Sequence, residues 1–267
     1  MVIHYTEYGN KSAPLMVFIH GGGVSGWMWD QQIRYFVNYH CLVPDLPEHG
    51  GSRGSLFSIN ESAIQLAELI AEKGKGKTVI VIGFSLGAQV LIAMLSKIPD
   101  VIDYAMINSA LVKPISYKKL LLRSIIWTHP LIKIKAFSKI QAKSMYIDDN
   151  YFEIYYQESC GISKEAFVRV LDENLSFSIP QNFKNVSSRI LVTVGEKERG
   201  MMKKSYEDLV NSNSNCKGVI FPNVGHGISL AEPEYFNEFV KNWLSDEEDW
   251  RMPREKRLPA AEINSIV

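Results

Sequence analysis

A serine stands between two glycines where an apolar run gives way to a helical pattern. In TVIVIGFSLGAQV (78–90) the β-branched run ends at Gly83, Ser85 follows two residues later, and a long apolar helical pattern begins after it. A serine at such a strand-turn-helix corner occupies a sharp, strained turn, and flanking glycines are needed because side chains there would collide with the neighbouring strand and helix. Ser85 is therefore a candidate nucleophile, and a turn that merely contains a serine is the alternative.

A serine hydroxyl attacks a carbonyl only after a base takes its proton, so the chain should also supply a histidine. Of the six histidines, only His226 follows the last apolar run, and it lies between Gly225 and Gly227 in PNVGHGISLAEP. This tight loop can bring an imidazole over the edge of a sheet, which makes His226 the candidate base. A turn histidine that caps the following helix is the alternative. His20 and His49 are expected to organise their own glycine-rich loops.

Acyl transfer further requires hydrogen-bond donors for the negative charge on the tetrahedral intermediate. The stretch HGGGVSGWMW (20–29) lets the backbone approach a substrate closely, and the N–H of Gly22 is the candidate donor. The N–H of Leu86, directly after the serine, is the second. Gly-rich loops also cradle phosphates, but the chain has neither a G-x-G-x-x-G pattern nor a G-K-[ST] pattern with P-loop spacing, which disfavours nucleotide binding.

These residues must be positioned by a scaffold that alternates strands with helices. Nearly continuous apolar runs, bounded by Gly, Pro or Asn, occur at 15–20, 41–44, 78–83, 104–108, 189–195 and 217–222. Strands covered on both faces have this composition, and helical patterns lie between them. The sequence predicts an α/β protein with a mostly parallel, doubly wound sheet and helices on both faces.

The alternation stops between 111 and 188, where the pattern is helical. We predict a core over 1–245 interrupted by a helical lid at 111–188, followed by a charge-dense tail at 246–267 that is a mobile extension or a helix packed on the core. Residues 113–143 contain basic side chains and no acidic one, whereas 148–173 is mainly acidic. One interpretation is that the oppositely charged lid helices attract one another or simply stay solvated. The other is that the basic, apolar segment contacts lipid or an acidic partner.

The composition excludes several classes of protein. The 267 residues include 29 basic and 29 acidic side chains, so the chain as a whole offers no charge footprint for nucleic acid or an anionic membrane, and a small, neutral partner is favoured. The N-terminal residues do not form a secretory signal, and no run reaches the roughly 18 apolar residues of a membrane span. Cys41, Cys160 and Cys216 are odd in number and widely separated, so we expect reduced thiols and a cytoplasmic protein. The sequence leaves the oligomeric state open.

At these motifs the chain resembles the α/β-hydrolase superfamily, over nearly all of its length outside the lid and tail. HGGGVSGWMWDQQ is similar to the oxyanion loop of small esterase-like members, IGFSLGA to the nucleophile elbow, and VGHGISLAEPEYFNEFVKNWL to the histidine loop and last helix. VPDLPEHGGSR resembles the stretch after the next strand, with Glu48 where glycine is usual. The resemblance implies the α/β-hydrolase fold, with a helical cap at the position of the lid and the chain order nucleophile, acid, histidine.

The acid departs from the family pattern. The family typically has an aspartate three residues after the glycine that ends the seventh strand, and VTVGEKERG places Glu198 there. A glutamate can accept the Nδ1–H of histidine, but its extra methylene shifts the reach of the carboxylate. Glu198 is the candidate acid and Glu196 the neighbouring alternative, while another acid, or none, stays open. The alternative is that GEKER is an ordinary solvated, charged loop.

Together these residues predict a serine hydrolase that cleaves a carboxylic ester or related acyl bond through an acyl-serine intermediate, without metal or organic cofactor. The apolar composition of the lid favours an apolar acyl or alcohol part in the substrate. The same residues could serve a thioesterase, a lactonase, a C–C bond hydrolase or a lyase. A ligand-binding protein on this fold with little turnover is the alternative from a different class.

Overall fold

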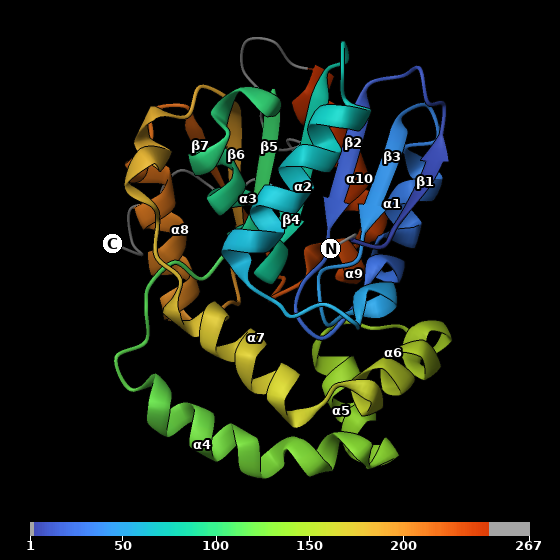
Figure 1. Ribbon diagram of the computed structural model, residues 1–267, viewed down its shortest axis with the longest axis vertical. Helices are drawn as coiled ribbons and strands as arrows, with labels where there is room; N and C mark the ends of the chain where they lie inside the picture. Colours follow the sequence, from blue (N-terminus) through green and yellow to red (C-terminus); the bar gives the residue numbers. More distant parts are fainter. Residues whose placement is uncertain (1–2, 246–267) are drawn as a thin grey trace.

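Seven strands form a single sheet in the order β1-β3-β2-β4-β5-β6-β7 (Figure 1). The computed structural model describes residues 3–245, and for 125, 127 and 128 only the course of the backbone, so the tail predicted at 246–267 lies outside the described residues. The strands are β1 (Tyr5–Gly9), β2 (Leu15–Ile19), β3 (His40–Pro44), β4 (Val79–Phe84), β5 (Tyr104–Asn108), β6 (Arg189–Gly195) and β7 (Cys216–Phe221).

The six strands predicted from apolar runs are β2 to β7, and every pairing among them is parallel. This confirms the parallel, doubly wound sheet. The first strand, β1, was not predicted. It runs antiparallel to β3 at the edge of the sheet, and its residues YTEYG are exposed or half-buried. A strand that is covered on one side only lacks the continuous apolar run by which the others were found.

Alternate residues of the central strands enter two different cores, because successive side chains of a strand point to opposite faces. In β2, Leu15, Val17 and Ile19 pack into one core, whereas Met16 and Phe18 pack into the other. The helices of the first face are α2 (Ile59–Lys73), α3 (Leu86–Lys97) and α8 (Gly200–Ser212), and those of the second are α1 (Asp30–Tyr35) and α10 (Pro233–Ser245) (Figure 1). Helices therefore cover both faces, as predicted.

Residues 111–188, which are called the helical segment from this point on, connect β5 to β6. They form α4 (Lys118–Thr128), η4 (His129–Lys133), α5 (Lys135–Ser144), α6 (Asp149–Gly161), α7 (Lys164–Ser176) and η5 (Gln181–Asn185). Figure 1 shows α4 to α7 beyond the ends toward which the arrows of β2 and β4 point. The helical segment thus lies over the carboxyl edge of the parallel strands, where ligands of open α/β sheets bind.

Short elements complete the connections between strands and helices. They are η1 (Gly26–Trp29) after β2, η2 (Gly50–Ser52) after β3, η3 (Pro99–Val101) before β5, and α9 (Ile228–Ala231) after β7. Because η1, η2 and α9 follow the carboxyl ends of their strands, they lie at the same edge of the sheet as the helical segment.

The corner between β4 and α3 is packed so closely that it requires glycine on both sides. A Cβ on Gly87 would lie 2.4 Å from the carbonyl oxygen of Ile19, and a Cβ on Gly83 would lie 2.6 Å from the carbonyl oxygen of Gly87. Both neighbours are backbone atoms of central elements and cannot move aside as a flexible side chain would. The two glycines therefore let α3 start directly against β2 and β4.

Gly87→Ala should lower the free energy of unfolding by about 2 kcal/mol or more, because the new methyl group forces α3 away from the sheet. Urea unfolding followed by circular dichroism measures this change. Gly200→Ala is the matched control, since it places a methyl group in the first turn of α8 with no atom within 4 Å. A Gly87→Ala protein as stable as the control would contradict the close packing of α3 against β2.

Candidate active site

Ser85 stands alone between β4 and α3 in a conformation that side chains rarely adopt. Its φ is 52° and its ψ is −111°. Its N–H donates to the carbonyl of Asn108 at the end of β5, and its own carbonyl accepts from the N–H of Ala88, at 2.9 and 3.1 Å. A positive φ in a non-glycine residue is strained and persists only where the surroundings impose it. Strand and helix together hold the hydroxyl out from the backbone at the carboxyl edge.

Ser85, His226 and Glu198 form a continuous chain of hydrogen bonds. Nε2 of His226 is 3.0 Å from Oγ of Ser85, and Nδ1 of His226 is 2.8 Å from Oε2 of Glu198. An ionised carboxylate can only accept, so Nδ1 carries the proton and Nε2 is left as the acceptor for the serine hydroxyl. The structure thus brings the three predicted residues together from the turns after β4, β7 and β6.

The histidine is accessible and the acid is buried. The side chain of His226 is 41% exposed, whereas that of Glu198 is 1% exposed. The imidazole packs against Phe84, with ring centroids 4.8 Å apart. One edge of the imidazole is therefore open to an incoming molecule, while the carboxylate behind it is screened from water.

Glu196, the alternative acid, points elsewhere. Its Oε2 accepts a hydrogen bond from the N–H of Asn223 at 2.7 Å, in the turn after β7. Its backbone N–H donates to the carbonyl of Phe221. Glu196 stabilises the connection between β6 and β7, and among the two candidates only Glu198 contacts His226.

Ser109 is a polar neighbour of the acid that was not predicted from the sequence. Its Oγ donates to Oε1 of Glu198 at 2.6 Å, and the N–H of Gly195 donates to the same oxygen at 3.0 Å. Ser109 follows β5 directly and has a φ of 57°. The signal was present in the dipeptide Asn108-Ser109, two polar residues at the carboxyl end of the strand next to β6. With Oε1 held in this way, Oε2 is left for the histidine.

Burial alone would raise the pKa of Glu198. Its hydrogen bond and charge interaction with His226, together with the donors from Ser109 and Gly195, outweigh that effect and hold the pKa below its usual value. The carboxylate is therefore ionised throughout the neutral pH range, as an acceptor of the Nδ1–H must be.

A cavity of about 250 Å³ opens beside Ser85, and both predicted oxyanion donors line it. A Cβ on Gly22 would lie 3.6 Å from the side chain of Leu86, so the two residues are neighbours. Leu86 is the first residue of α3, where a backbone N–H has no partner within the helix. The helical segment supplies a mainly apolar wall, including Ile132, Met145, Ile162, Phe167, Val170 and Leu171.

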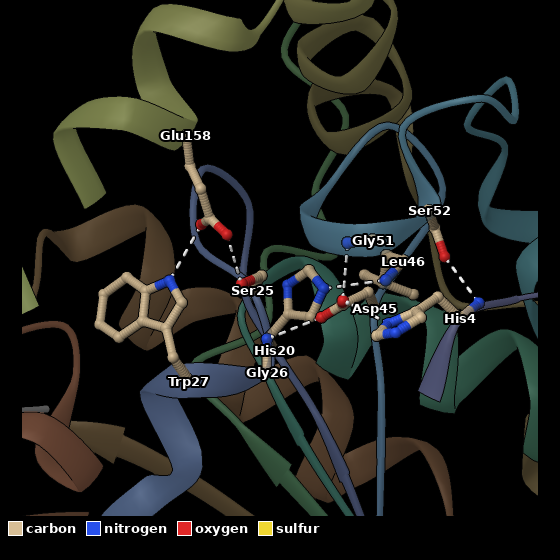
Figure 2. Close-up of polar contacts among 10 residues, drawn as sticks. All are labelled: His4, His20, Ser25, Gly26, Trp27, Asp45, Leu46, Gly51, Ser52 and Glu158. Atoms are coloured by element: carbon tan, nitrogen blue, oxygen red, sulfur yellow. Dashed lines mark hydrogen bonds and ion pairs between the residues drawn. The ribbon is translucent and has the colours of Figure 1, made fainter. Parts of the chain in front are cut away.

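His20 fixes the glycine loop rather than taking part in the hydrogen-bonded chain. Its Nε2 accepts from the N–H of Leu46 at 2.8 Å (Figure 2). Its Nδ1 donates to the carbonyl of Gly21 at 2.7 Å. Burial and the neighbouring His49 lower the pKa of His20 to about 3, so the ring is neutral. His49 in turn contacts the carbonyl of Pro47 through Nδ1. Both histidines organise the loops after β2 and β3, as expected.

Asp45 ties the same loops to the edge of the sheet. Its carboxylate accepts from the N–H groups of Gly26 and Gly51 at 2.9 and 2.8 Å, and it pairs with Nδ1 of His4 at 2.9 Å (Figure 2). These contacts join η1, η2 and the residue before β1 around one buried carboxylate. The glycine loop that carries Gly22 is therefore tied to the loop after β3.

Glu48 stands where the resemblance predicts glycine, and its backbone has a conformation that favours glycine. Its φ is 66°, which glycine adopts without strain. The buried carboxylate accepts from Nε and the terminal nitrogen of Arg169 on α7, at 3.1 to 3.2 Å, and from the N–H of Phe57 at 3.3 Å. These hydrogen bonds offset the strain and join the wall of the cavity to the helical segment.

Glu158 makes a second connection between the helical segment and the core. From α6 it accepts from Oγ of Ser25 at 2.8 Å and from Nε1 of Trp27 at 2.9 Å (Figure 2). The ring of Trp27 stacks on Tyr151 of the same helix, with centroids 5.4 Å apart. One acidic side chain of the helical segment, Glu158, thus binds two donors of the core that follow the glycine loop.

Between 3 and 245, no group of three or more His, Cys, Asp or Glu side chains is placed to hold a metal ion. No helix in that range is both long enough and apolar enough to cross a membrane. Cys41, Cys160 and Cys216 are free thiols.

The chain is similar to known proteins over most of its length. A family model described as "Alpha/beta hydrolase family" matches residues 16–239. An AB hydrolase superfamily protein of Gibberella zeae is 34% identical over 94 residues, which cover 34% of this chain and 33% of the relative. An esterase of Mycobacterium tuberculosis is 33% identical over 94 residues, or 34% of this chain and 31% of the relative. The matches therefore span about a third of the length of these curated relatives.

A solved structure agrees over a larger part of the chain. The esterase of Exiguobacterium antarcticum superposes with a TM-score of 0.77, covering 91% of this chain and 96% of that one. At 15% sequence identity, this similarity establishes the fold and nothing about the substrate.

The lowered pKa of Glu198 predicts a specific pH dependence of stability. The stabilisation from a carboxyl whose pKa falls on folding is fully present above its unfolded value, near 4.5, and is lost as the pH falls through the folded value. Below about pH 4.5, wild type should therefore lose stability more steeply than Glu198→Gln, which cannot ionise. Ser109→Ala should lie between them, because one donor to the carboxylate is gone. Urea unfolding at a series of pH values measures the three slopes.

Ser188→Ala is the control for the loss of a buried serine hydroxyl. Its Oγ donates to the carbonyl of Ile102, in the connection between η3 and β5 and away from Glu198. This variant should follow the slope of wild type. Equal slopes for wild type and Glu198→Gln would show that the carboxylate is not stabilised in the folded protein.

Proposed function

The chain belongs to the alpha/beta hydrolase family, and on that premise we propose that it is a serine hydrolase that cleaves carboxylic esters through an acyl-serine intermediate. Ser85 is the nucleophile, His226 the general base and acid, and Glu198 the residue that orients the histidine. The observation that carries this assignment is the 3.0 Å contact between Oγ of Ser85 and Nε2 of His226, with Glu198 on the other ring nitrogen.

In the first half of the reaction, Nε2 of His226 takes the proton of the Ser85 hydroxyl while Oγ attacks the ester carbonyl. The carbonyl oxygen becomes an oxyanion, and the N–H groups of Gly22 and Leu86 stabilise it. Glu198 accepts the Nδ1–H and stabilises the imidazolium that forms. The imidazolium then donates its Nε2 proton to the departing alkoxide, so the alcohol leaves and the acyl group stays on Ser85.

In the second half, water replaces the alcohol. Nε2 of His226 takes a proton from the water, the resulting hydroxide adds to the acyl carbonyl, and the oxyanion again forms beside Gly22 and Leu86. Collapse of this intermediate breaks the bond to Oγ of Ser85, which recovers a proton from the imidazolium. The products are a carboxylic acid and the regenerated serine.

The helical segment is proposed to act as a lid that selects an apolar substrate. Its wall of aliphatic and aromatic side chains favours an apolar acyl or alcohol part, since burial of apolar surface is the main source of affinity in such a cavity. The volume of about 250 Å³ is smaller than most cavities that hold drug-sized ligands, which favours short esters.

A fluorophosphonate probe should form a covalent adduct on Ser85 of the folded protein, because the phosphonate phosphorus is attacked by the same activated hydroxyl. Peptide mapping by mass spectrometry locates the adduct. Ser85→Ala should remain folded, give no adduct, and hydrolyse p-nitrophenyl acetate at least about a thousandfold more slowly than wild type. Intact, folded wild type without an adduct on Ser85 would count decisively against the proposal.

Glu198 and Glu196 form a matched pair for testing the acid. Glu198→Ala should lower kcat for p-nitrophenyl acetate by about a hundredfold or more, since the imidazolium loses its partner. Glu196→Ala removes a carboxylate from the same loop and should leave kcat within about twofold of wild type. The opposite pattern would assign the role to Glu196.

A further inference from the structure

Exposed apolar side chains are concentrated in one part of the helical segment. Eleven large apolar side chains are exposed among the residues whose side chains the structure describes, and six of them lie between 117 and 146. They are Tyr117, Leu120, Leu131, Ile134, Ile140 and Tyr146. Leu120 on α4 and Ile140 on α5 are each 70% exposed. Isolated surface leucines need no explanation, but a concentration of this kind marks a surface that contacts something.

The same elements carry cations that the fold does not neutralise. Four basic side chains of 113–143 form ion pairs, among them Lys118 with Asp172, Lys135 with Glu153 and Lys139 with Asp149, so part of the predicted attraction between the acidic and basic halves is present. The other four have no ion-pair partner among residues 3–245 and are exposed. These are Lys119, Arg123, Lys133 and Lys143.

At η4 and α5, this surface is the outer side of elements that line the cavity. On η4, Ile132 lines the cavity, whereas its neighbours Leu131 and Lys133 are exposed. On α5, Gln141 lines the cavity, whereas Ile140 and Lys143 are exposed. Figure 1 shows α4 at the end of the molecule farthest from the strands, with no element beyond it. The docking face is defined as the exposed residues of α4, η4 and α5. It is separated from the cavity by one layer of helix at η4 and α5, whereas α4 packs against α7, which itself lines the cavity.

We propose that the docking face binds the surface of a membrane that contains anionic lipids. Uncompensated lysine and arginine side chains would meet the lipid phosphates, while the exposed leucines and isoleucines would enter the boundary between headgroups and acyl chains. Lysine is depleted at protein–protein interfaces, whose centres are rich in aromatic residues, so this composition fits lipid better than an acidic protein. Binding is peripheral, and no helix within residues 3–245 could span the bilayer.

Docking through this face would bring η4 and α5, which line the cavity, to the membrane surface, where apolar esters accumulate. This consequence rests on the proposed function, whereas the binding itself does not. For that reason the test uses the Ser85→Ala protein, in which lipid binding is separated from turnover.

Cosedimentation with vesicles of phosphatidylcholine, with and without phosphatidylglycerol, tests the proposal. The protein should bind the anionic vesicles at least about tenfold more tightly than the neutral ones, and raising the salt from about 0.1 M to about 1 M should weaken this binding. The pair Lys119→Glu and Lys143→Glu, and separately the pair Leu120→Ser and Ile140→Ser, should each reduce binding about tenfold or more.

Matched controls carry the same changes on other surfaces. Lys75→Glu with Lys217→Glu alters two exposed lysines, and Val37→Ser with Leu56→Ser alters two exposed apolar residues, at 57% and 67% exposure. These controls should bind as tightly as the parent. Absence of binding to anionic vesicles, or equal losses in the controls, would overturn the proposal. So would a dimer in solution that Leu120→Ser with Ile140→Ser dissociates, because a second copy would then cover the docking face.

Discussion

The hydrogen bond between the buried carboxylate of Glu198 and Nδ1 of His226 is the contact on which the site depends. It sets the tautomer of the imidazole, and only with the proton on Nδ1 can Nε2 accept from Ser85. The carboxylate is 1% exposed and would be costly to bury without partners. Ser109 and Gly195 donate to its second oxygen. The carboxylate is therefore ionised, held in one orientation and buried from solvent.

The sheet makes this contact possible because it collects the ends of parallel strands at one edge. Ser85 follows β4, Ser109 follows β5 and Glu198 follows β6, which are consecutive in the sheet. Two of these three residues, Ser85 and Ser109, have positive φ, so the backbone is strained where the functional side chains project. Close packing of α3 and the strand pairings of β5 with β6 hold that strain in place.

Much of this arrangement could be predicted from the sequence because it leaves a local trace. Continuous apolar runs revealed β2 to β7, and glycines beside Ser85 and His226 revealed the tight turns around them. The edge strand β1 left no such run, since only one of its sides is covered. The local sequence could not decide between Glu198 and Glu196, because both precede the same helix. Only the fold directs Glu198 toward the end of β5 and Glu196 toward the turn after β7.

Contacts between residues far apart in the chain could not be predicted from the sequence for the same reason. Ser109 and Glu198 are 89 residues apart, and Glu48 and Arg169 are 121 residues apart. The unusual Glu48 was visible in the sequence, but its hydrogen bonds to Arg169 follow from how α7 lies on the core. Likewise, the basic stretch 113–143 was evident in the sequence, whereas only the structure separates its paired cations from those that remain exposed.

Proton NMR of His226 tests the central contact most directly. A hydrogen bond from Nδ1–H to a buried carboxylate slows exchange with water and moves the proton resonance far downfield of ordinary imidazole N–H signals. Wild type and Glu196→Ala should both show this resonance, and Glu198→Ala and His226→Ala should both lack it. A resonance that survives in Glu198→Ala, or that is absent from folded wild type, would contradict the central role of the hydrogen bond between Glu198 and His226.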